Sequence, residues 1–239
     1  TGFSAYIQEA FIDKVDLEEF KFDDFSFTYQ IEKIPLVNWN SEWEKNFEPV
    51  LVENLLCIRA PFHPKNTLVK HEIVIMPKMS FGTGHHQTTR LMCRQMFETN
   101  FKNKKVLDMG CGTGILAILA KMLGAKEATG IDIDAWSVEN AVENCASNGF
   151  PEISIKKGDL AELMNESPFD IILANINKNI LKAQIPVYAQ KLNENGILFL
   201  SGFFTTDLDE LKVTSEQNGF SFFSSKNEAE WAMMILSKN

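Results

Sequence analysis

A glycine-rich turn between a strand and a helix constrains the fold of this chain more than any other feature. Residues 106–114 read VLDMGCGTG, and an apolar helical segment follows them directly. Glycines at alternate positions permit a tight turn and allow a ligand to contact the bare backbone. We therefore expect the first strand of an open α/β sheet to end here, at a ligand-binding loop.

The rest of the sequence from Val106 onward fits such a sheet. Short apolar runs predict seven strands, at residues 106–109, 128–133, 153–156, 171–175, 197–201, 220–224 and 231–236. Helices are expected between the early strands, with Asp134 as an N-cap and with Gly124 and Gly149 at helix ends. A run over 177–192 contains Pro186, which predicts a kink or a late helix start. The connection at 225–230 is too short for a crossover helix, so the last two strands should pair antiparallel.

The spacing of the glycines and of two acids indicates which ligand this loop holds. A dinucleotide site requires G-x-G-x-x-G, whereas this chain has G-x-G-x-G at Gly110, Gly112 and Gly114. Asp108 would repel a phosphate, but it suits the sulfonium and ammonium groups of S-adenosylmethionine. Asp132 lies 22 residues beyond Gly110, the offset at which an acid accepts hydrogen bonds from ribose hydroxyls. A purely structural glycine turn and an exposed strand-end acid are the alternatives.

Charge and cysteine usage narrow the classes of partner. The 239 residues carry 23 basic and 32 acidic side chains, and the net charge of −9 disfavours nucleic acid and suits a basic partner. Residues 1–45 hold ten acids and four lysines, which is two-thirds of that charge. No apolar run approaches the ~18 residues of a membrane helix, so no membrane contact is expected. The four cysteines form no CxxC pair, which indicates reduced thiols, a cytoplasmic location and no zinc site.

Two patterns in the N-terminal part predict local structure. Residues 25–31 (FSFTYQI) alternate strictly between apolar and polar side chains, as a half-buried strand does. Trp39, Trp43 and Phe47 recur at helical spacing, which predicts a short amphipathic connecting helix over residues 38–49. The strand–helix–strand fragment that precedes this helix is too small to hold its own core well.

Four further motifs lead from a superfamily to a family. The glycine loop and Asp132 resemble the nucleotide-binding half of class I S-adenosylmethionine-dependent methyltransferases, over about residues 106–239. Residues 76–89 (MPKMSFGTGHHQTT) resemble the P-G-x-A-F-G-T-G-T-H-x-T-T loop of the PrmA family. The family's Asn-Ile-Leu signature is matched by Ala174-Asn175-Ile176. Its Trp-rich connector is matched by Trp39, Trp43 and Phe47, and its Glu-Trp pair by Glu230-Trp231. The chain is therefore similar to the PrmA family, whose members methylate the eleventh protein of the large ribosomal subunit.

This resemblance implies a fold and a division into domains. The fold is a Rossmann-like class I methyltransferase, with a mostly parallel seven-stranded sheet and an antiparallel last strand, plus a small α+β N-terminal domain. Residues 1–37 resemble only the second half of the family's recognition domain, whose beginning is expected to be missing. Residues 38–60 would connect it to a methyltransferase domain at 61–239.

The resemblance also implies an activity. Members of the family transfer methyl groups from S-adenosylmethionine, without a metal, to amino groups of a ribosomal protein. We therefore expect this chain to act as a monomer on lysine side chains or an N-terminal amine of a basic ribosomal protein, without contacting nucleic acid directly.

Position by position, the resemblance assigns roles to residues of this chain. It implies that the cofactor is contacted by Thr89, Gly110, Asp132 and Asn175. The further cofactor-binding candidates are Phe81, Gly82, Thr83, Asp108 and Gly112. The catalytic candidates are Asn175, which would orient the attacking amine, and His86. His86 would either take a proton or hydrogen-bond the loop closed, and we favour the second role. A plain turn-forming role is the alternative for Asn175, and Cys111 is expected to pack rather than react.

The sequence departs from the family pattern at the rim of the substrate channel rather than in the cofactor site. The departures are PKM at residues 77–79, His85 in place of Thr, Gln87 in place of Pro and Asn177 in place of Leu. Three other functions stay open. One is a class I methyltransferase acting on a small molecule or another protein. Another is a nicotinamide-dependent dehydrogenase, against which the missing third spaced glycine argues. The last is a non-catalytic S-adenosylmethionine-binding protein, against which the intact loop at 81–89 argues.

Overall fold

The computed structural model describes residues 7, 28, 30, 47–78, 80–164 and 166–239. The chain separates into two compact units, Thr1–Trp43 and Glu44–Asn239. The strand expected at 25–31 and the helix expected at 38–49 lie almost entirely outside the described residues, and residues 47–49 are not helical. The fold below is that of the second unit.

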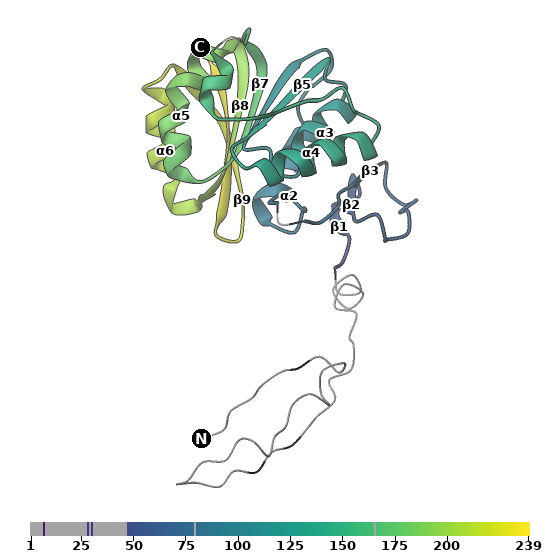
Figure 1. The fold of residues 1–239 in the computed structure, drawn as a ribbon. Coiled ribbons are helices and arrows are strands. Elements are labelled where there is room, and N and C mark those ends of the chain that lie inside the picture. Colours follow the sequence, from purple (N-terminus) through teal and green to yellow (C-terminus); the bar gives the residue numbers. More distant parts are fainter. Residues whose placement is uncertain (1–6, 8–27, 29, 31–46, 79, 165) are drawn as a thin grey trace. The chain divides into compact units, whose positions relative to one another are not determined.

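A seven-stranded sheet forms the centre of this unit (Figure 1). Its strands are β4 (Lys105–Met109), β5 (Glu127–Asp132), β6 (Ser154–Lys157), β7 (Phe169–Asn175), β8 (Leu192–Phe204), β9 (Phe220–Glu228) and β10 (Trp231–Lys238). The order across the sheet is β6-β5-β4-β7-β8-β10-β9. The strands from β6 to β8 pair parallel, whereas β10 pairs antiparallel with both β8 and β9. All seven predicted strands and the antiparallel hairpin are thus confirmed, as is the class I methyltransferase fold.

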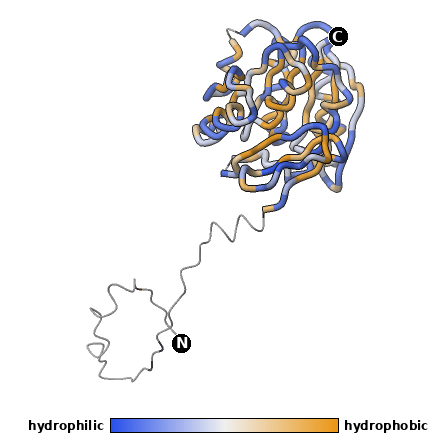
Figure 2. The backbone as a smooth tube through the Cα atoms, turned by 90° about the vertical axis from the view of Figure 1, so that its right-hand side faces the viewer, coloured by the Kyte–Doolittle hydropathy of each residue, from blue (hydrophilic) through white to orange (hydrophobic). Residues whose placement is uncertain are grey.

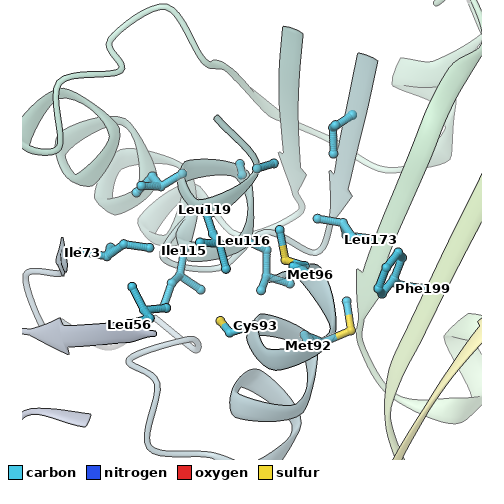
Figure 3. Close-up of a cluster of buried hydrophobic side chains, with 14 of the residues drawn as sticks. Leu56, Ile73, Met92, Cys93, Met96, Ile115, Leu116, Leu119, Leu173 and Phe199 are labelled. Atoms are coloured by element: carbon cyan, nitrogen blue, oxygen red, sulfur yellow. The ribbon is translucent and has the colours of Figure 1, made fainter. Parts of the chain in front are cut away.

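Helices cover both faces of the sheet (Figure 1). The helices are α2 (Gln87–Phe97), α3 (Ile115–Met122), α4 (Ala135–Ser147), α5 (Lys178–Lys191) and α6 (Leu208–Glu216), with short 3₁₀ helices η3 (Leu160–Leu163) and η4 (Thr205–Asp207). On one face α2 and α3 bury Met92, Leu116 and Leu119 in a core that also contains Phe199 of β8 (Figure 3). On the other face α5 and α6 bury Leu181 and Leu211. Apolar stretches therefore run along the strands between the two helical layers (Figure 2).

The ends of these helices follow the sequence signals in most cases. Asp134 caps α4 by accepting a hydrogen bond from the backbone N–H of Trp136, and Gly124 and Gly149 follow α3 and α4 in left-handed conformations. Pro186 predicted either a kink or a late start for the helix over 177–192, and the late start is wrong, because α5 begins at Lys178 and continues through Pro186. Pro186 is exposed, so water can satisfy the carbonyl that lacks a helical partner.

A three-stranded sheet precedes the large one in the sequence. It consists of β1 (Val50–Val52), β2 (Leu56–Arg59) and β3 (His71–Val74), with β1 antiparallel and β3 parallel to β2. Strands β1 and β2 were not predicted from the sequence. Leu56 and Ile73 of this sheet join the core that contains α2 and α3 (Figure 3). Within the described residues, no helix combines the length and the apolar character that crossing a membrane requires.

Candidate functional site

A cleft of about 520 Å³ opens at the carboxyl ends of the central strands, and its volume lies in the range of small-molecule sites. Residues that follow β4, β5, β6 and β7 line it, together with residues of the segment before α2 and the first residue of β10. Strand β5 pairs with one edge of β4 and β7 pairs with the other edge, so the strand order changes direction at β4. Open α/β sheets bind ligands at such a switch point.

The glycine loop after β4 forms one wall of this cleft. Gly110 and Gly112 line it, and both adopt positive φ angles, of 73° and 53°. A Cβ atom at Gly110 would lie 2.3 Å from the Ile176 side chain, and one at Gly112 would lie 2.3 Å from the carbonyl oxygen of Phe81. Any larger residue would therefore push away the neighbouring loops, which explains why glycine is needed at both positions.

Asp132, the last residue of β5, lines the cleft beside this loop. One carboxylate oxygen accepts a hydrogen bond of 2.9 Å from the Gly112 N–H, and the other accepts one of 3.0 Å from the Asp134 N–H. The carboxylate thus connects β5 to the glycine loop. Each oxygen retains a further lone pair, with which a bound hydroxyl group can pair.

Asp108 lies under the glycine loop rather than in the cleft. It is 1% exposed and does not line the cleft, and its Oδ2 accepts a hydrogen bond of 3.1 Å from the Ala117 N–H in α3. Burial, with a smaller contribution from the charge of Asp132, raises the pKa of Asp108 to about 7. Cys111 beside it is buried as well, which raises the pKa of its thiol and leaves it a packing role, as expected.

His86 begins α2 and forms the opposite wall of the cleft. Its Nδ1 accepts a hydrogen bond of 3.3 Å from the Thr88 N–H, so the imidazole acts as the N-cap of this helix. The His86 ring packs edge-on against Trp231 at a centroid distance of 4.6 Å, and Phe81 lies 5.3 Å away on another side. We name Phe81, His86 and Trp231, which all line the cleft, the aromatic wall.

The hydrogen bond at Nδ1 determines what His86 can do. A neutral ring whose Nδ1 accepts a hydrogen bond carries its own proton on Nε2. Burial, and secondly the nearby Arg90 charge, hold the pKa of His86 below its usual value, which favours this neutral form. In this tautomer Nε2 donates a hydrogen bond and cannot accept a proton. The arrangement supports the loop-fixing role of His86 over proton transfer.

Asn175 ends β7 and lines the cleft between the glycine loop and the strand β8. Its Oδ1 atom is buried and has no hydrogen-bond partner among the described residues. An unsatisfied buried acceptor costs about 1–3 kcal/mol, so a ligand that donates a hydrogen bond here gains affinity.

The remaining predicted residues lie around the cleft without lining it. Gly82 accepts a hydrogen bond of 2.7 Å from the Thr113 hydroxyl, and the Thr83 hydroxyl lies 3.1 Å from Nδ1 of His85. Thr89 is fully buried in α2, and its hydroxyl has no partner in the described part of the chain. The structure thus brings together Phe81, His86, Gly110, Gly112, Asp132 and Asn175 in one cleft, but not Gly82, Thr83, Thr89 or Asp108.

Sequence reasoning missed several residues of the cleft. Gly158 follows β6, and Gly202 lies near the end of β8, where its φ is 91° and a Cβ would lie 2.4 Å from the Ile176 carbonyl oxygen. The switch-point rule was applied only to the first, second and fourth predicted strands. Gly158 lies two residues after the predicted strand at 153–156, and Gly202 directly follows the one at 197–201. The same rule could therefore have found both glycines. Among the described residues, no group of three or more His, Cys, Asp or Glu side chains is placed to hold a metal ion.

Comparison with known proteins gives consistent matches. The family model described as Ribosomal protein L11 methyltransferase (PrmA) matches residues 3–239. Proteins named ribosomal protein L11 methyltransferase from Bacteroides thetaiotaomicron and Phocaeicola vulgatus are 41% and 42% identical to this chain. Each alignment covers 97% of this chain and 84% of the relative.

A solved structure agrees with these matches. The crystal structure of a ribosomal protein L11 methylase from Lactobacillus delbrueckii subsp. bulgaricus superimposes with a TM-score of 0.74 at 30% identity, covering 80% of this chain and 99% of that one. A methyltransferase from Pyrococcus furiosus shares the fold, with a TM-score of 0.57 at 16% identity over 70% of this chain and 88% of that one.

Proposed function

This chain belongs to the ribosomal protein L11 methyltransferase (PrmA) family, and from that premise we propose that it methylates amino groups of ribosomal protein L11. It is an S-adenosylmethionine-dependent methyltransferase, as the family is. One observation carries the proposal for its chemistry: Asn175, whose buried Oδ1 has no partner in the described part of the chain, lines the same cleft as the aromatic wall.

The residues of the cleft suit S-adenosylmethionine. Gly110 and Gly112 offer backbone without side chains, Asp132 offers a carboxylate for ribose hydroxyls, and the volume of about 520 Å³ accommodates a nucleoside with an amino-acid arm. When bound, S-adenosylmethionine supplies an electrophilic methyl group on a sulfonium. Asp108 is buried and accepts a hydrogen bond from the backbone of α3, the helix that follows the glycine loop, and so helps to fix the position of that loop.

The chain's own residues prepare the attacking amine. A lysine must lose its proton to attack, although the pKa of a free lysine is ~10.4. The aromatic wall desolvates the amine, which lowers its pKa, and the proton leaves to solvent because Nε2 of His86 donates rather than accepts. Asn175 Oδ1 accepts a hydrogen bond from the amine and so directs the nitrogen lone pair. Positioning and exclusion of water supply the rate enhancement.

We further propose the setting in which the enzyme works. Its free cysteines, all four buried, suit a reducing compartment, which supports a cytoplasmic location. The net charge of −9 supports a basic protein substrate, free or on the ribosome, over direct contact with nucleic acid. Residues 1–37 are proposed as part of a recognition domain, joined through 38–60 to the methyltransferase domain at 61–239. The enzyme is proposed to act as a monomer, which sedimentation would check.

Labelling identifies the substrate. The chain is incubated with methyl-labelled S-adenosylmethionine and total protein of ribosomes that lack L11 methylation, and the proteins are then separated. We expect label in L11, and none when an excess of S-adenosylhomocysteine competes with S-adenosylmethionine for the cofactor site. Label in another protein, or only in a small-molecule fraction added separately, contradicts the proposed substrate.

A further inference from the structure

Helix α4 carries a column of asparagines on one face. Asn140, Asn144 and Asn148 recur every fourth residue, and the first two are at most 1% exposed. All three bond to the backbone of the segment that continues β3. Asparagine is not a favoured residue in a helix interior, where Asn140 and Asn144 lie, and Asn148 is the C-cap; the regular spacing of the three calls for an explanation from tertiary contacts.

The asparagine column takes the place of a neighbouring strand. Asn148 accepts from the Val74 N–H at 2.8 Å and donates to the Val74 carbonyl at 2.7 Å. Two residues further on, Asn144 accepts from the Met76 N–H at 2.9 Å, and Asn140 donates to the Met76 carbonyl at 3.2 Å. Four helical residues rise ~6 Å and two strand residues ~6.6 Å, so the two repeats match. Residues 74 and 76 are thereby held along α4, while the backbone of Ile75 bonds to Arg59 of β2 on the other side.

Asn144 has a second bond that the other two asparagines lack. Its amide donates to the carbonyl of Thr113 in the glycine loop, at 3.0 Å in a buried environment. Thr113 in turn donates from its N–H to Phe81 at 2.9 Å and from its hydroxyl to Gly82 at 2.7 Å. The segment between Met76 and Phe81 is therefore fixed at one end by Asn144 directly and at the other end through Thr113.

We propose that Asn144 is a positioning residue for the methyl-transfer site, which fixes the glycine loop against the segment that carries Phe81 and His86. The inference rests on the proposed role of the glycine loop in holding the cofactor. Asn144 reaches the cleft only through other residues: it sets the position of the Thr113 backbone, which follows directly on the cleft-lining Gly112. Asn144 thus influences the position of one wall of the cofactor site without lining that site.

Asn148 provides a matched control for Asn144. Asn148→Ala removes bonds to Val74 and to the Asn144 carbonyl, whereas Asn144→Ala removes bonds to Met76 and to Thr113. Both variants should lower the free energy of unfolding by comparable amounts in urea titrations. Calorimetric titration with S-adenosylhomocysteine should separate them: ~10-fold weaker binding for Asn144→Ala and less than ~2-fold for Asn148→Ala, as expected for loss of about one net hydrogen bond at the site.

A second variant keeps the proposal testable if Asn144→Ala does not fold. Thr113→Val keeps the shape of the side chain and removes only its bond to Gly82, so it should also weaken binding, by ~3–10-fold. Equal affinity losses in Asn144→Ala and Asn148→Ala, or a Thr113→Val variant that binds like the parent, overturn the inference. A parent protein that does not bind S-adenosylhomocysteine refutes the proposed function instead, and the inference with it.

Discussion

Replacing Asp132 by alanine should weaken cofactor binding more than it weakens the fold. The carboxylate accepts hydrogen bonds from the N–H groups of Gly112 and Asp134, at 2.9 and 3.0 Å, and it lines the cleft. Its proposed bonds to the ribose hydroxyls are hydrogen bonds to a charged group, worth roughly 1.5–3 kcal/mol, which corresponds to roughly 10–150-fold in affinity. Asp132→Asn retains the shape and one acceptor, so its loss should be smaller, about 2–10-fold.

Calorimetry with S-adenosylhomocysteine measures these losses directly. Asp170→Ala is the matched control, because Asp170 also accepts a backbone N–H, that of Lys105 at 2.8 Å, but at the amino end of β4, away from the cleft. This control should lose stability in urea titrations and keep its affinity. If Asp132→Ala binds S-adenosylhomocysteine as tightly as the parent, Asp132 is not the ribose acceptor and the reasoning fails.

Three further predictions concern other parts of the chain. Asn175→Ala should reduce turnover at saturating cofactor by ~10²-fold and change cofactor affinity less, because the proposed role of Asn175 is to orient the amine. A loss confined to affinity would make Asn175 a cofactor ligand only. The pKa of Asp108 is about 7 in the folded protein and ~3.9 in the unfolded chain, so the folded protein binds this proton more tightly. The free energy of unfolding therefore falls by up to about 4 kcal/mol as the pH rises from about 4 to about 7. Asp108→Asn should remove this fall in urea titrations, and parallel profiles for variant and parent would contradict the assignment. Deleting residues 1–37 should leave S-adenosylhomocysteine binding intact, raise the KM for the protein substrate and make this KM less dependent on salt. The reason is that the charge of −6 in residues 1–45 would steer a basic protein toward the enzyme. An unchanged KM at low salt would place recognition elsewhere.

The large sheet was predictable because its central strands, such as β4 and β7, are buried on both faces. Such strands appear in the sequence as short apolar runs, and each of the seven lies at its predicted place. The extent of β8 was not predictable, because residues 193–196 read NENG, a turn-like sequence, yet they extend the strand with Asn195 at a φ of 59°. Strands β1 and β2, of three and four residues, are too short for an alternating pattern to be recognised.

The residues of the site that lie at strand ends could be predicted from the sequence, whereas contacts between loops could not. The glycine loop, Asp132 and Asn175 lie at the carboxyl ends of three strands that are neighbours in the sheet, so one rule of α/β sheets places them in one cleft. The same rule placed Asp108 there as well, but its carboxyl turns under the loop and is buried, an orientation that strand position alone does not determine. The bonds between Thr113 and the loop at Phe81 join segments about thirty residues apart and leave no local pattern in the sequence.

The proposal that the chain methylates amines of L11 is tested most directly by mapping the modified atoms. Unmethylated L11 is incubated with the chain and S-adenosylmethionine, and peptide mass spectrometry then locates each added methyl group. The account predicts methyl groups on lysine side-chain nitrogens or on the N-terminal amine, in amounts that fall sharply with Asn175→Ala. Methyl groups on carboxylate oxygens, or an unmodified L11 with an enzyme that binds S-adenosylhomocysteine, would contradict it.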